Sequence, residues 1–175
     1  ETWCNEEVSN ALLNIPGYCI EPELRLDRND TLNGIGGGLI VYAKENLIIK
    51  PLPRNNDTEN LIKLLEDSSE NHIFIGDFNF PLINWNEKTS DRACQNFLEC
   101  TVANDFPQMI NFPTHVRGNI LDLVLTNQPD NIVNIEALGN LSTSDHSILS
   151  VDINFRSKFN KTTEMINDWK NEDSE

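Results

Sequence analysis

The chain is organised around residues 72–81, which read His-Ile-Phe-Ile-Gly-Asp-Phe-Asn-Phe-Pro. Ile73–Ile75 is a short apolar run of β-branched and aromatic residues, which is typical of a buried strand. Gly76 follows and gives the backbone freedom to turn. Asp77 and Asn79 come next at alternate positions, so a backbone that stayed extended would point both side chains the same way. The stretch therefore predicts a strand that ends in a carboxylate and a carboxamide.

A carboxylate and an amide at the end of a strand suit the chemistry of phosphate esters. The carboxylate of Asp77 can hold a hard cation or orient a water, and the amide of Asn79 can donate to a phosphate oxygen. The same residue types also form ordinary turns after strands, because Asp and Asn bond readily to their own backbone. Residues 76–79 alone leave both interpretations open.

Two later stretches favour the chemical interpretation. Residues 121–127 read Leu-Asp-Leu-Val-Leu-Thr-Asn, and residues 144–147 read Ser-Asp-His-Ser just before a further apolar strand pattern, Ile148–Phe155. An acid inside an apolar run is rare unless it is paired, so Asp122 is predicted to bind His146. A carboxylate on one imidazole nitrogen fixes the tautomer and raises the basicity of the other nitrogen.

Three stretches keep the spacing of an amphipathic helix. An N-terminal helix is expected to begin after Asn5 as its cap, to place Val8, Ala11, Leu12 and Ile15 on its apolar face, and to end at Pro16-Gly17.

A middle helix is expected to begin at Asp57 or Thr58, and a third helix to begin at Ser90 or Asp91 and to end by Asn104. Their apolar faces are predicted to consist of Leu61, Ile62, Leu64 and Leu65 in the middle helix, and of Cys94, Phe97, Leu98 and Thr101 in the third.

These motifs, in this order, resemble those of the endonuclease/exonuclease/phosphatase superfamily, and above all the endonuclease domains of non-LTR retrotransposons. The opening Glu-Thr-Trp, residues 1–3, matches the first motif of that family. Residues 111–115 resemble its Phe-Pro-Thr-Arg element, with His115 in the place where arginine is common. Each motif is weak alone, whereas Glu-Thr-Trp, Gly-Asp-Phe-Asn, Leu-Asp-Leu-Val-Leu-Thr-Asn and Ser-Asp-His in the family's order make a specific signal.

The resemblance implies an α/β fold of two packed, mostly antiparallel β-sheets flanked by helices, which is the four-layer sandwich of the DNase type. We expect an incomplete version of it, because no strand precedes Glu1 and residues 50–57 are too few for a hairpin that relatives have there. Losing strands would expose the apolar faces of their neighbours. Residues 1–155 are expected to form this partial domain, and residues 156–175 a polar tail or linker.

The resemblance also implies catalytic roles. Asp77 would orient or deprotonate the attacking water, and Asn79 would bind a phosphate oxygen. His146, aligned by Asp122, would bind the phosphate and stabilise its developing charge.

Metal and substrate contacts are implied in the same way. Glu1 would bind the metal ion, and Asp145 would support the metal or the histidine. Mg²⁺ is the expected ion, with Mn²⁺ as the alternative, because Mg²⁺ takes oxygen ligands and needs few from the protein. Thr114 is expected to bind a substrate phosphate, although a hydroxyl that stabilises a turn is an equal alternative. His115 is interpreted as a surface residue.

Composition limits these expectations. The formal net charge is −15, which predicts weak affinity for DNA because phosphate binding depends largely on Lys and Arg. No stretch is apolar for long enough to span a membrane. The four cysteines form no Cys-x-x-Cys pair, which indicates reduced thiols of an intracellular protein, nuclear or cytoplasmic.

Three functions remain open at this stage. The first is a Mg²⁺-dependent, DNA-nicking endonuclease domain of a retrotransposon-derived protein, with a reverse transcriptase domain in the full-length parent. The second is a phosphatase or phosphodiesterase of the same superfamily that acts on a substrate other than nucleic acid, which the acidic balance favours slightly. The third is a catalytically impaired remnant of a mobile element, which the missing segments favour.

Overall fold

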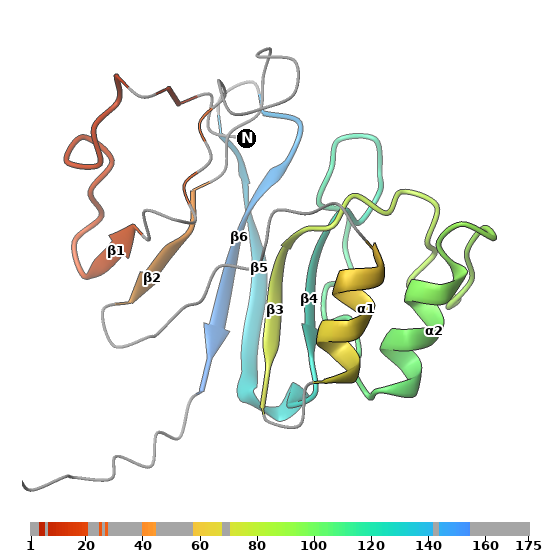
Figure 1. The fold of residues 1–175 in the computed structure, drawn as a ribbon. Coiled ribbons are helices and arrows are strands. Elements are labelled where there is room, and N and C mark those ends of the chain that lie inside the picture. The colour runs from red at the N-terminus through yellow and green to blue at the C-terminus, as the bar shows by residue number, and fades with distance from the viewer. Residues whose placement is uncertain are drawn as a thin grey trace, which may run out of the picture.

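The computed structural model of the chain describes residues 4–5, 7–20, 25, 27, 40–44, 58–67, 71–141 and 144–154. Within these ranges the chain forms an α/β fold of antiparallel strands and two α-helices (Figure 1). Predictions were also made for Glu1, for residues 50–57 and for the tail 156–175, and these lie outside the described residues.

The helices are α1, Thr58–Glu66, and α2, Gln95–Ala103. The strands of the described part are β1 Tyr18–Ile20, β2 Tyr42–Lys44, β3 Ile73–Asp77, β4 Asp122–Thr126, β5 Ile132–Asn140 and β6 Ser147–Ile153, with a 3-10 turn at Pro129–Asn131. Two of the three predicted helices are therefore present. The helix expected between Asn5 and Pro16 is wrong, because residues 7–17 form turns and the apolar side chains of Leu12 and Ile15 are exposed instead of packing against the domain.

Helix α2 begins later than predicted because residues 92–94 form a turn, in which Asp91 Oδ1 accepts the Cys94 N–H at 3.1 Å. Neither helix is long and apolar enough to cross a membrane.

Strands β3 and β4 form an antiparallel pair whose register runs from Ile73 opposite Thr126 to Asp77 opposite Asp122. Side chains that face each other across such a pair lie on the same side of the sheet. Phe74 and Leu125 therefore share one face, on which both are buried. The two acids share the opposite face, at the end where β3 stops and β4 starts.

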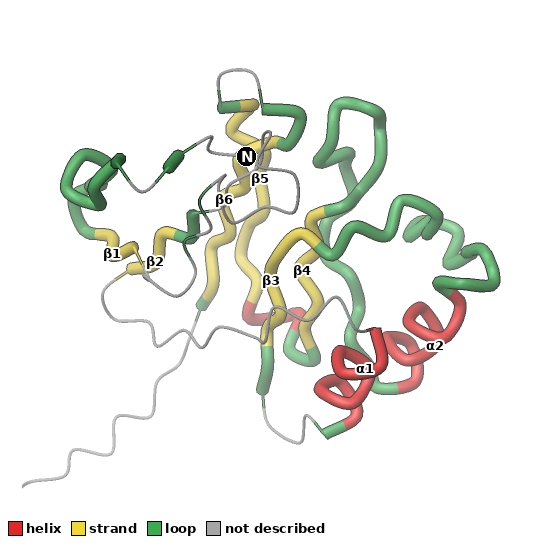
Figure 2. The backbone as a smooth tube through the Cα atoms, turned by 45° about the horizontal axis from the view of Figure 1, so that its top comes forward, coloured by secondary structure: helices red, strands yellow, loops and turns green. Residues whose placement is uncertain are grey.

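Helices α1 and α2 lie side by side over the face of β3 and β4 that carries Phe74 (Figures 1 and 2). Phe97 of α2 is fully buried at the centre of this layer. The core consists of Leu65, Phe74, Ile83, Cys94, Phe97, Leu98, Cys100, Phe106, Leu123 and Leu125. Burial of these apolar side chains is the main force that holds the helices on the sheet.

The segment 107–116, which lies between α2 and β4 in the chain, forms hydrogen bonds with both β4 and the start of β6. Its first part pairs with β4, since the Met109 N–H donates to the Val124 carbonyl at 2.9 Å. Its last part pairs with the start of β6, since the Ser147 N–H donates to the Thr114 carbonyl at 2.8 Å. An antiparallel bridge sets His115 opposite His146. One segment therefore brings the 121–127 motif and the 144–147 motif to the same place.

The α/β class and the antiparallel pairing are confirmed, and the arrangement is consistent with an incomplete DNase-like fold. The described strands form three two-stranded sheets, β1–β2, β3–β4 and β5–β6, rather than two broad ones. The side chain of Ile75, on the face of β3 away from the helices, is 51% exposed. A large apolar side chain in the middle of a strand is normally covered. Its exposure here is what the expectation of missing neighbouring strands predicts.

We predict that Phe97→Ala lowers the free energy of unfolding by about 3–5 kcal/mol, because it leaves a cavity where three aromatic rings meet one helix. Val102→Ala is the matched control, since Val102 lies on the same helix with 54% of its surface exposed, and it should stay within about 0.5 kcal/mol of the parent. Urea unfolding followed by circular dichroism measures both. Equal midpoints for the two variants would contradict the central place of Phe97.

Candidate active site

The site begins where the β3–β4 register places Asp77 opposite Asp122. Asp77 is exposed at the end of its strand, yet the protein around it partly removes its carboxylate from water. That desolvation, together with the negative charge of Asp122, raises the pKa of Asp77, although His146 partly opposes the shift. A carboxylate with a raised pKa is a better proton acceptor than an ordinary one.

The two aromatic residues that follow Asp77 anchor this strand end to the core. Phe78 and Phe80 stack on Phe97, with ring centroids 6.2 Å and 4.4 Å away. Asn79 lies between them with φ of 51°, in the left-handed region that Asn tolerates better than most residues. Its N–H donates to Asp77 Oδ1 at 3.0 Å.

The expectation that the backbone stays extended through Asn79 is therefore wrong. Phe78 and Phe80 both stack on Phe97, while the backbone between them takes the left-handed conformation at Asn79. The result is a turn closed by the Asp77 carboxylate, the plainer of the two alternatives that the sequence left open. The exposed Asn79 side chain lies beside Asp77 through this turn rather than through the pleat of a strand.

The predicted bond between Asp122 and His146 is present, with Asp122 Oδ2 2.9 Å from His146 Nδ1. This bond raises the pKa of His146 against the opposing effect of desolvation, and the charges of Asp122, Asp77 and Asp145 raise it further. Because Asp122 occupies Nδ1, the Nε2 atom is left for a ligand.

Thr114 supports Asp122 rather than a ligand. Its side chain is 0% exposed, and its hydroxyl accepts the N–H groups of Leu121 at 3.0 Å and Asp122 at 3.1 Å. A fully buried hydroxyl with these partners cannot reach a substrate phosphate, so the expected substrate contact of Thr114 is corrected. The alternative, a hydroxyl that stabilises local backbone, fits the structure.

His115 belongs to the site, and its interpretation as a surface residue is wrong. Its side chain is only 10% exposed, and its Nε2 lies 3.2 Å from Asp145 Oδ2. Its ring meets that of His146 edge to face, with centroids 5.0 Å apart. The sequence signal was the position of His115 directly after Thr114 in a family motif, but the pairing with His146 depends on a backbone bridge between distant segments.

Asp145 completes the group. Desolvation raises the pKa of its carboxyl, but the hydrogen bond from His115, a backbone hydrogen bond and the nearby imidazoles outweigh that effect and leave the pKa lowered. Its Oδ1 atom is buried and finds no hydrogen-bond partner among the described residues. A buried carboxylate oxygen without a partner is the kind of donor that a cation satisfies.

The structure therefore brings together five of the residues singled out by the sequence: Asp77, Asn79, Asp122, Asp145 and His146. Ligand atoms of His115, Asp145 and His146 all lie within 4.8 Å of one another, which makes these three a group that could hold a metal ion. Glu1, the metal ligand expected from the resemblance, lies outside the described residues.

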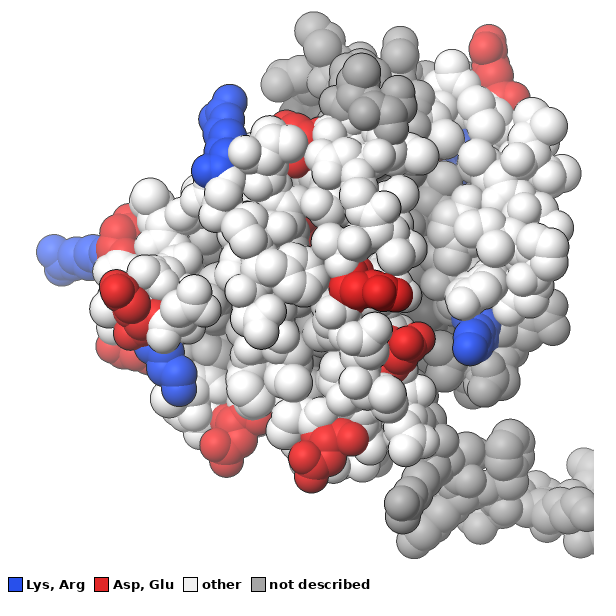
Figure 3. Space-filling model, turned by 180° about the vertical axis from the view of Figure 1, so that it is seen from behind, with Lys and Arg blue, Asp and Glu red and all other residues white. Residues whose placement is uncertain are grey.

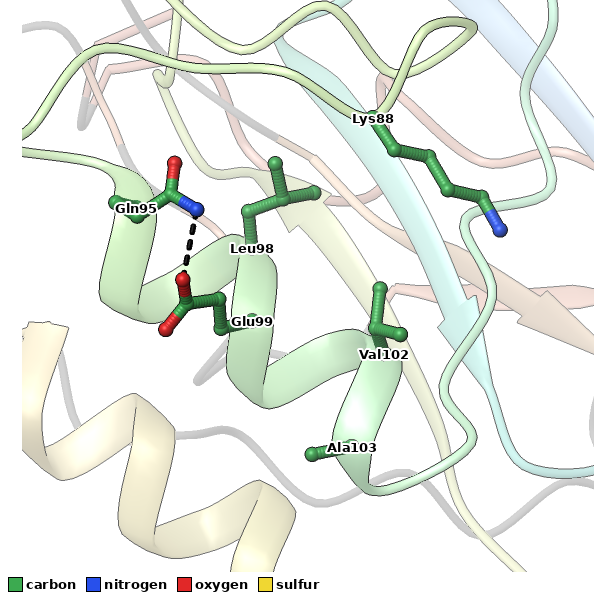
Figure 4. A pocket seen from close by; sticks show the side chains of 6 residues that line it. All are labelled: Lys88, Gln95, Leu98, Glu99, Val102 and Ala103. Atoms are coloured by element: carbon green, nitrogen blue, oxygen red, sulfur yellow. Dashed lines mark hydrogen bonds between the residues drawn. The ribbon is translucent and has the colours of Figure 1, made fainter.

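A shallow pocket of about 330 Å³ lies elsewhere, on the outer side of α2 (Figure 4). Lys88 lines it together with helix residues, among which the Gln95 amide donates to Glu99 Oε1 at 2.8 Å. None of the acids and histidines described above lines this pocket. It is therefore separate from the candidate active site.

Comparison with known families agrees with this arrangement. Residues 39–150, well over half of the chain, match a family model described as endonuclease-reverse transcriptase. The match covers Asp77, Asn79, Asp122, Asp145 and His146. Neither the comparison with curated proteins nor that with solved structures found a match.

The fold and the motifs place the protein among the endonucleases, exonucleases and phosphatases of one superfamily, whose members typically depend on metal ions. Within that class the chain belongs to the endonuclease-reverse transcriptase family, which groups it with the retrotransposon-type endonucleases. The resemblance seen in the sequence motifs is confirmed.

We predict that Thr114→Val lowers the free energy of unfolding, because two backbone N–H groups lose their acceptor in a place without solvent. The cost of one such unsatisfied group is about 1–3 kcal/mol. Thr114→Ser keeps the hydroxyl and serves as the matched control, with a much smaller effect. Thermal and urea unfolding measure both variants. Equal stability of Thr114→Val and the parent would show that these hydrogen bonds are dispensable.

The bond between Asp122 and His146 should also make stability depend on pH. Because the folded-state pKa of His146 is raised, its stabilising effect is complete below the unfolded pKa of about 6.5. It is lost as the pH rises through the higher folded value. Urea unfolding in EDTA across this range should show the loss in the parent, whereas His146→Gln should lack this part of the pH dependence. An unchanged profile in His146→Gln would assign the effect to another group.

Proposed function

We propose that this chain is the endonuclease domain of a retrotransposon-derived protein, and that it hydrolyses phosphodiester bonds in DNA with the help of a divalent metal ion. The observation that carries the proposal is the 2.9 Å bond between His146 Nδ1 and Asp122 Oδ2, next to Asp77. The bond fixes His146, the proposed proton donor, at the end of the sheet where Asp77, the proposed proton acceptor, lies opposite Asp122. All three residues lie within the region that matches the endonuclease-reverse transcriptase family.

Asp77 is the group proposed to take the proton from the attacking water. Its exposed position leaves room for a water, and its raised pKa improves it as a base. Asn79, held next to it by the turn, can donate its side-chain amide to a phosphate oxygen. Together they would align water and phosphate for an in-line attack.

His146 is the proposed donor to the phosphate. Its raised pKa favours the imidazolium form, and Asp122 accepts the proton on Nδ1. The N–H on Nε2 can then donate to a phosphate oxygen that gains negative charge as the new bond forms. Asp122 acts here through His146, which it orients.

The donor set fits a metal ion of the kind the family uses. Asp145 offers a carboxylate whose Oδ1 finds no partner in the described part of the chain, and Glu1 is the second ligand that we propose from the family motif. Mg²⁺ is the proposed ion and Mn²⁺ the alternative. When bound, it would neutralise phosphate charge and stabilise the leaving oxygen.

Affinity for DNA is proposed to be weak. The net charge is −15, and on the face seen in Figure 3 the described Lys and Arg side chains are few and lie far apart. A reverse transcriptase domain in a longer parent protein would then supply part of the nucleic-acid binding. The same acidity keeps a phosphatase or phosphodiesterase on another substrate as a second candidate.

The impaired remnant is the third candidate, and a specific observation favours it. Ile75 on β3, Val133 on β5 and Leu138 on β5 are 51%, 67% and 60% exposed. Large apolar side chains exposed on strands are what the loss of neighbouring strands would produce, and such a loss would lower stability at roughly 25 cal/mol per Å² of apolar area left uncovered. A low rate is therefore expected from this chain by itself.

We predict that His146→Ala and Asp77→Asn each lower the rate of Mg²⁺-dependent nicking of a supercoiled plasmid by about 10²–10³-fold relative to the unaltered chain. His72→Gln is the matched control, since His72 lies next to the opposite end of β3 and should keep the parent rate. Circular dichroism checks that each variant folds.

Nicking at the parent rate by His146→Ala or Asp77→Asn would remove that residue from the mechanism. A folded parent chain that fails to nick DNA but hydrolyses a simple phosphodiester would support the second candidate instead. A parent chain inactive on both substrates with Mg²⁺ and with Mn²⁺ would support the impaired remnant.

A further inference from the structure

The two histidines of the site face each other across a backbone bridge, with ring centroids 5.0 Å apart. His115 comes from the segment that leads to β4, whereas Asp145 and His146 come from the segment that leads into β6. Ligand atoms of the three side chains lie within 4.8 Å of one another. Two imidazoles and one carboxylate form a different ligand set from the two carboxylates, Asp145 and Glu1, that are proposed to hold Mg²⁺.

This donor set suits a different class of ion. Imidazole nitrogen is a preferred ligand of Zn²⁺ and similar transition ions, and two histidines with one carboxylate is a common set of protein ligands for zinc. Mg²⁺ prefers oxygen ligands and keeps most of its waters. The His115–Asp145–His146 group therefore selects for zinc-like ions over Mg²⁺.

The backbone holds the three residues in place before any ion arrives. The Val116 N–H donates to the Asp145 carbonyl at 2.9 Å, and the Ser147 N–H donates to the Thr114 carbonyl at 2.8 Å. These two bonds flank the bridge between His115 and His146. Little conformational entropy is then lost when the side chains converge on an ion.

His146 also has the partner that a metal-binding histidine usually has. Asp122 Oδ2 lies 2.9 Å from its Nδ1, so a neutral ring carries its proton there and turns the Nε2 lone pair toward a ligand. A carboxylate placed behind a histidine in this way orients the ring and makes it a stronger ligand.

His115 and Asp145 are spaced as two ligands of one ion. His115 Nε2 and Asp145 Oδ2 are 3.2 Å apart, and two ligands about 2.0–2.1 Å from a tetrahedral zinc ion lie about 3.3 Å from each other. The ion would replace the proton that now joins them. The proton would move to His115 Nδ1, which now accepts the Arg117 N–H at 3.2 Å, and water could satisfy that N–H because Arg117 is exposed.

Asp145 supplies an independent indication that a cation is needed here. Its Oδ1 atom is buried without a hydrogen-bond partner among the described residues, although its side chain as a whole is 49% exposed. One oxygen of the carboxylate is therefore left for a cation to bind, and the exposed edge of the side chain leaves a path for an ion from solvent.

We propose that His115, Asp145 and His146 form a binding site for Zn²⁺ or a similar transition-metal ion, and that occupation of this site inhibits the enzyme. Inhibition follows because the ion takes the Nε2 atom of His146, which then cannot donate to a phosphate. The binding site stands on its own geometry, whereas the inhibition rests on the proposed endonuclease function. His115 is the distinguishing ligand, since arginine is common at this position in the family.

The first experiment measures binding without activity. The full reduced chain is titrated with Co²⁺, whose visible spectrum reports tetrahedral nitrogen and oxygen ligands and separates them from thiolates, and Zn²⁺ is then used to displace the cobalt. His115→Gln should weaken Zn²⁺ affinity at least about tenfold, and Asp122→Asn about 10–100-fold through the histidine that it supports. His72→Gln removes the third histidine and should leave affinity unchanged.

Equal affinity of His115→Gln and the parent would overturn the proposed site, and so would a cobalt spectrum dominated by thiolate bands that no histidine substitution changes. Circular dichroism checks that the variants are folded. The proposed site is equally overturned if His115→Arg, which restores the residue common in the family, binds as tightly as the parent.

The second experiment measures nicking with Mg²⁺ at increasing Zn²⁺ concentration. The half-inhibitory concentration should rise at least about tenfold in His115→Gln when each protein is compared with its own zinc-free rate. Equal sensitivity of variant and parent would overturn inhibition through this site. If the parent chain does not nick DNA at all, the proposed function fails, while the binding experiment still decides whether the metal site exists.

Discussion

The buried hydrogen bonds of Thr114 link the two segments that carry Asp122 and His146. Its hydroxyl accepts the N–H groups of Leu121 and Asp122, and its carbonyl accepts the N–H of Ser147. One residue thus ties the start of β4, at Asp122, to the start of β6, at Ser147, although the two strands are far apart in the sequence. Asp122 and His146 belong to different strand pairs, so these hydrogen bonds help to set the distance between them.

The hydrophobic core supports the site from the other side. Phe78 and Phe80 stack on Phe97, so the strand end that carries Asp77 is fixed by apolar burial on α2 rather than by polar contacts. The left-handed turn at Asn79 lies between the two stacked rings. Asp77 and Asn79 are left exposed outside the core.

Acidic groups dominate the electrostatics of the site. Asp77, Asp122 and Asp145 all raise the pKa of His146, and Asp122 raises the pKa of Asp77. The three carboxylates favour the protonated form of His146, and negative charge around an imidazole favours cations. The same excess of acids weakens attraction to DNA, so cation binding and DNA binding place opposite demands on this surface.

The sequence by itself determined the order of the motifs, whose resemblance identifies the family. It also determined α1, α2, the strand at 73–75 and the pairing of Asp122 with His146, which follow from residue type, short-range periodicity and the rule that an acid inside an apolar strand needs a partner.

Only the tertiary structure decided that Asn79 turns, that the Thr114 hydroxyl serves the backbone, and that His115 belongs to the site. The last two depend on which distant segments pair: residue 114 against 121–122, and residues 114–116 against 145–147. Non-local pairing leaves no periodic trace in the sequence, because it is set by the closure of long loops and by burial summed over the whole core.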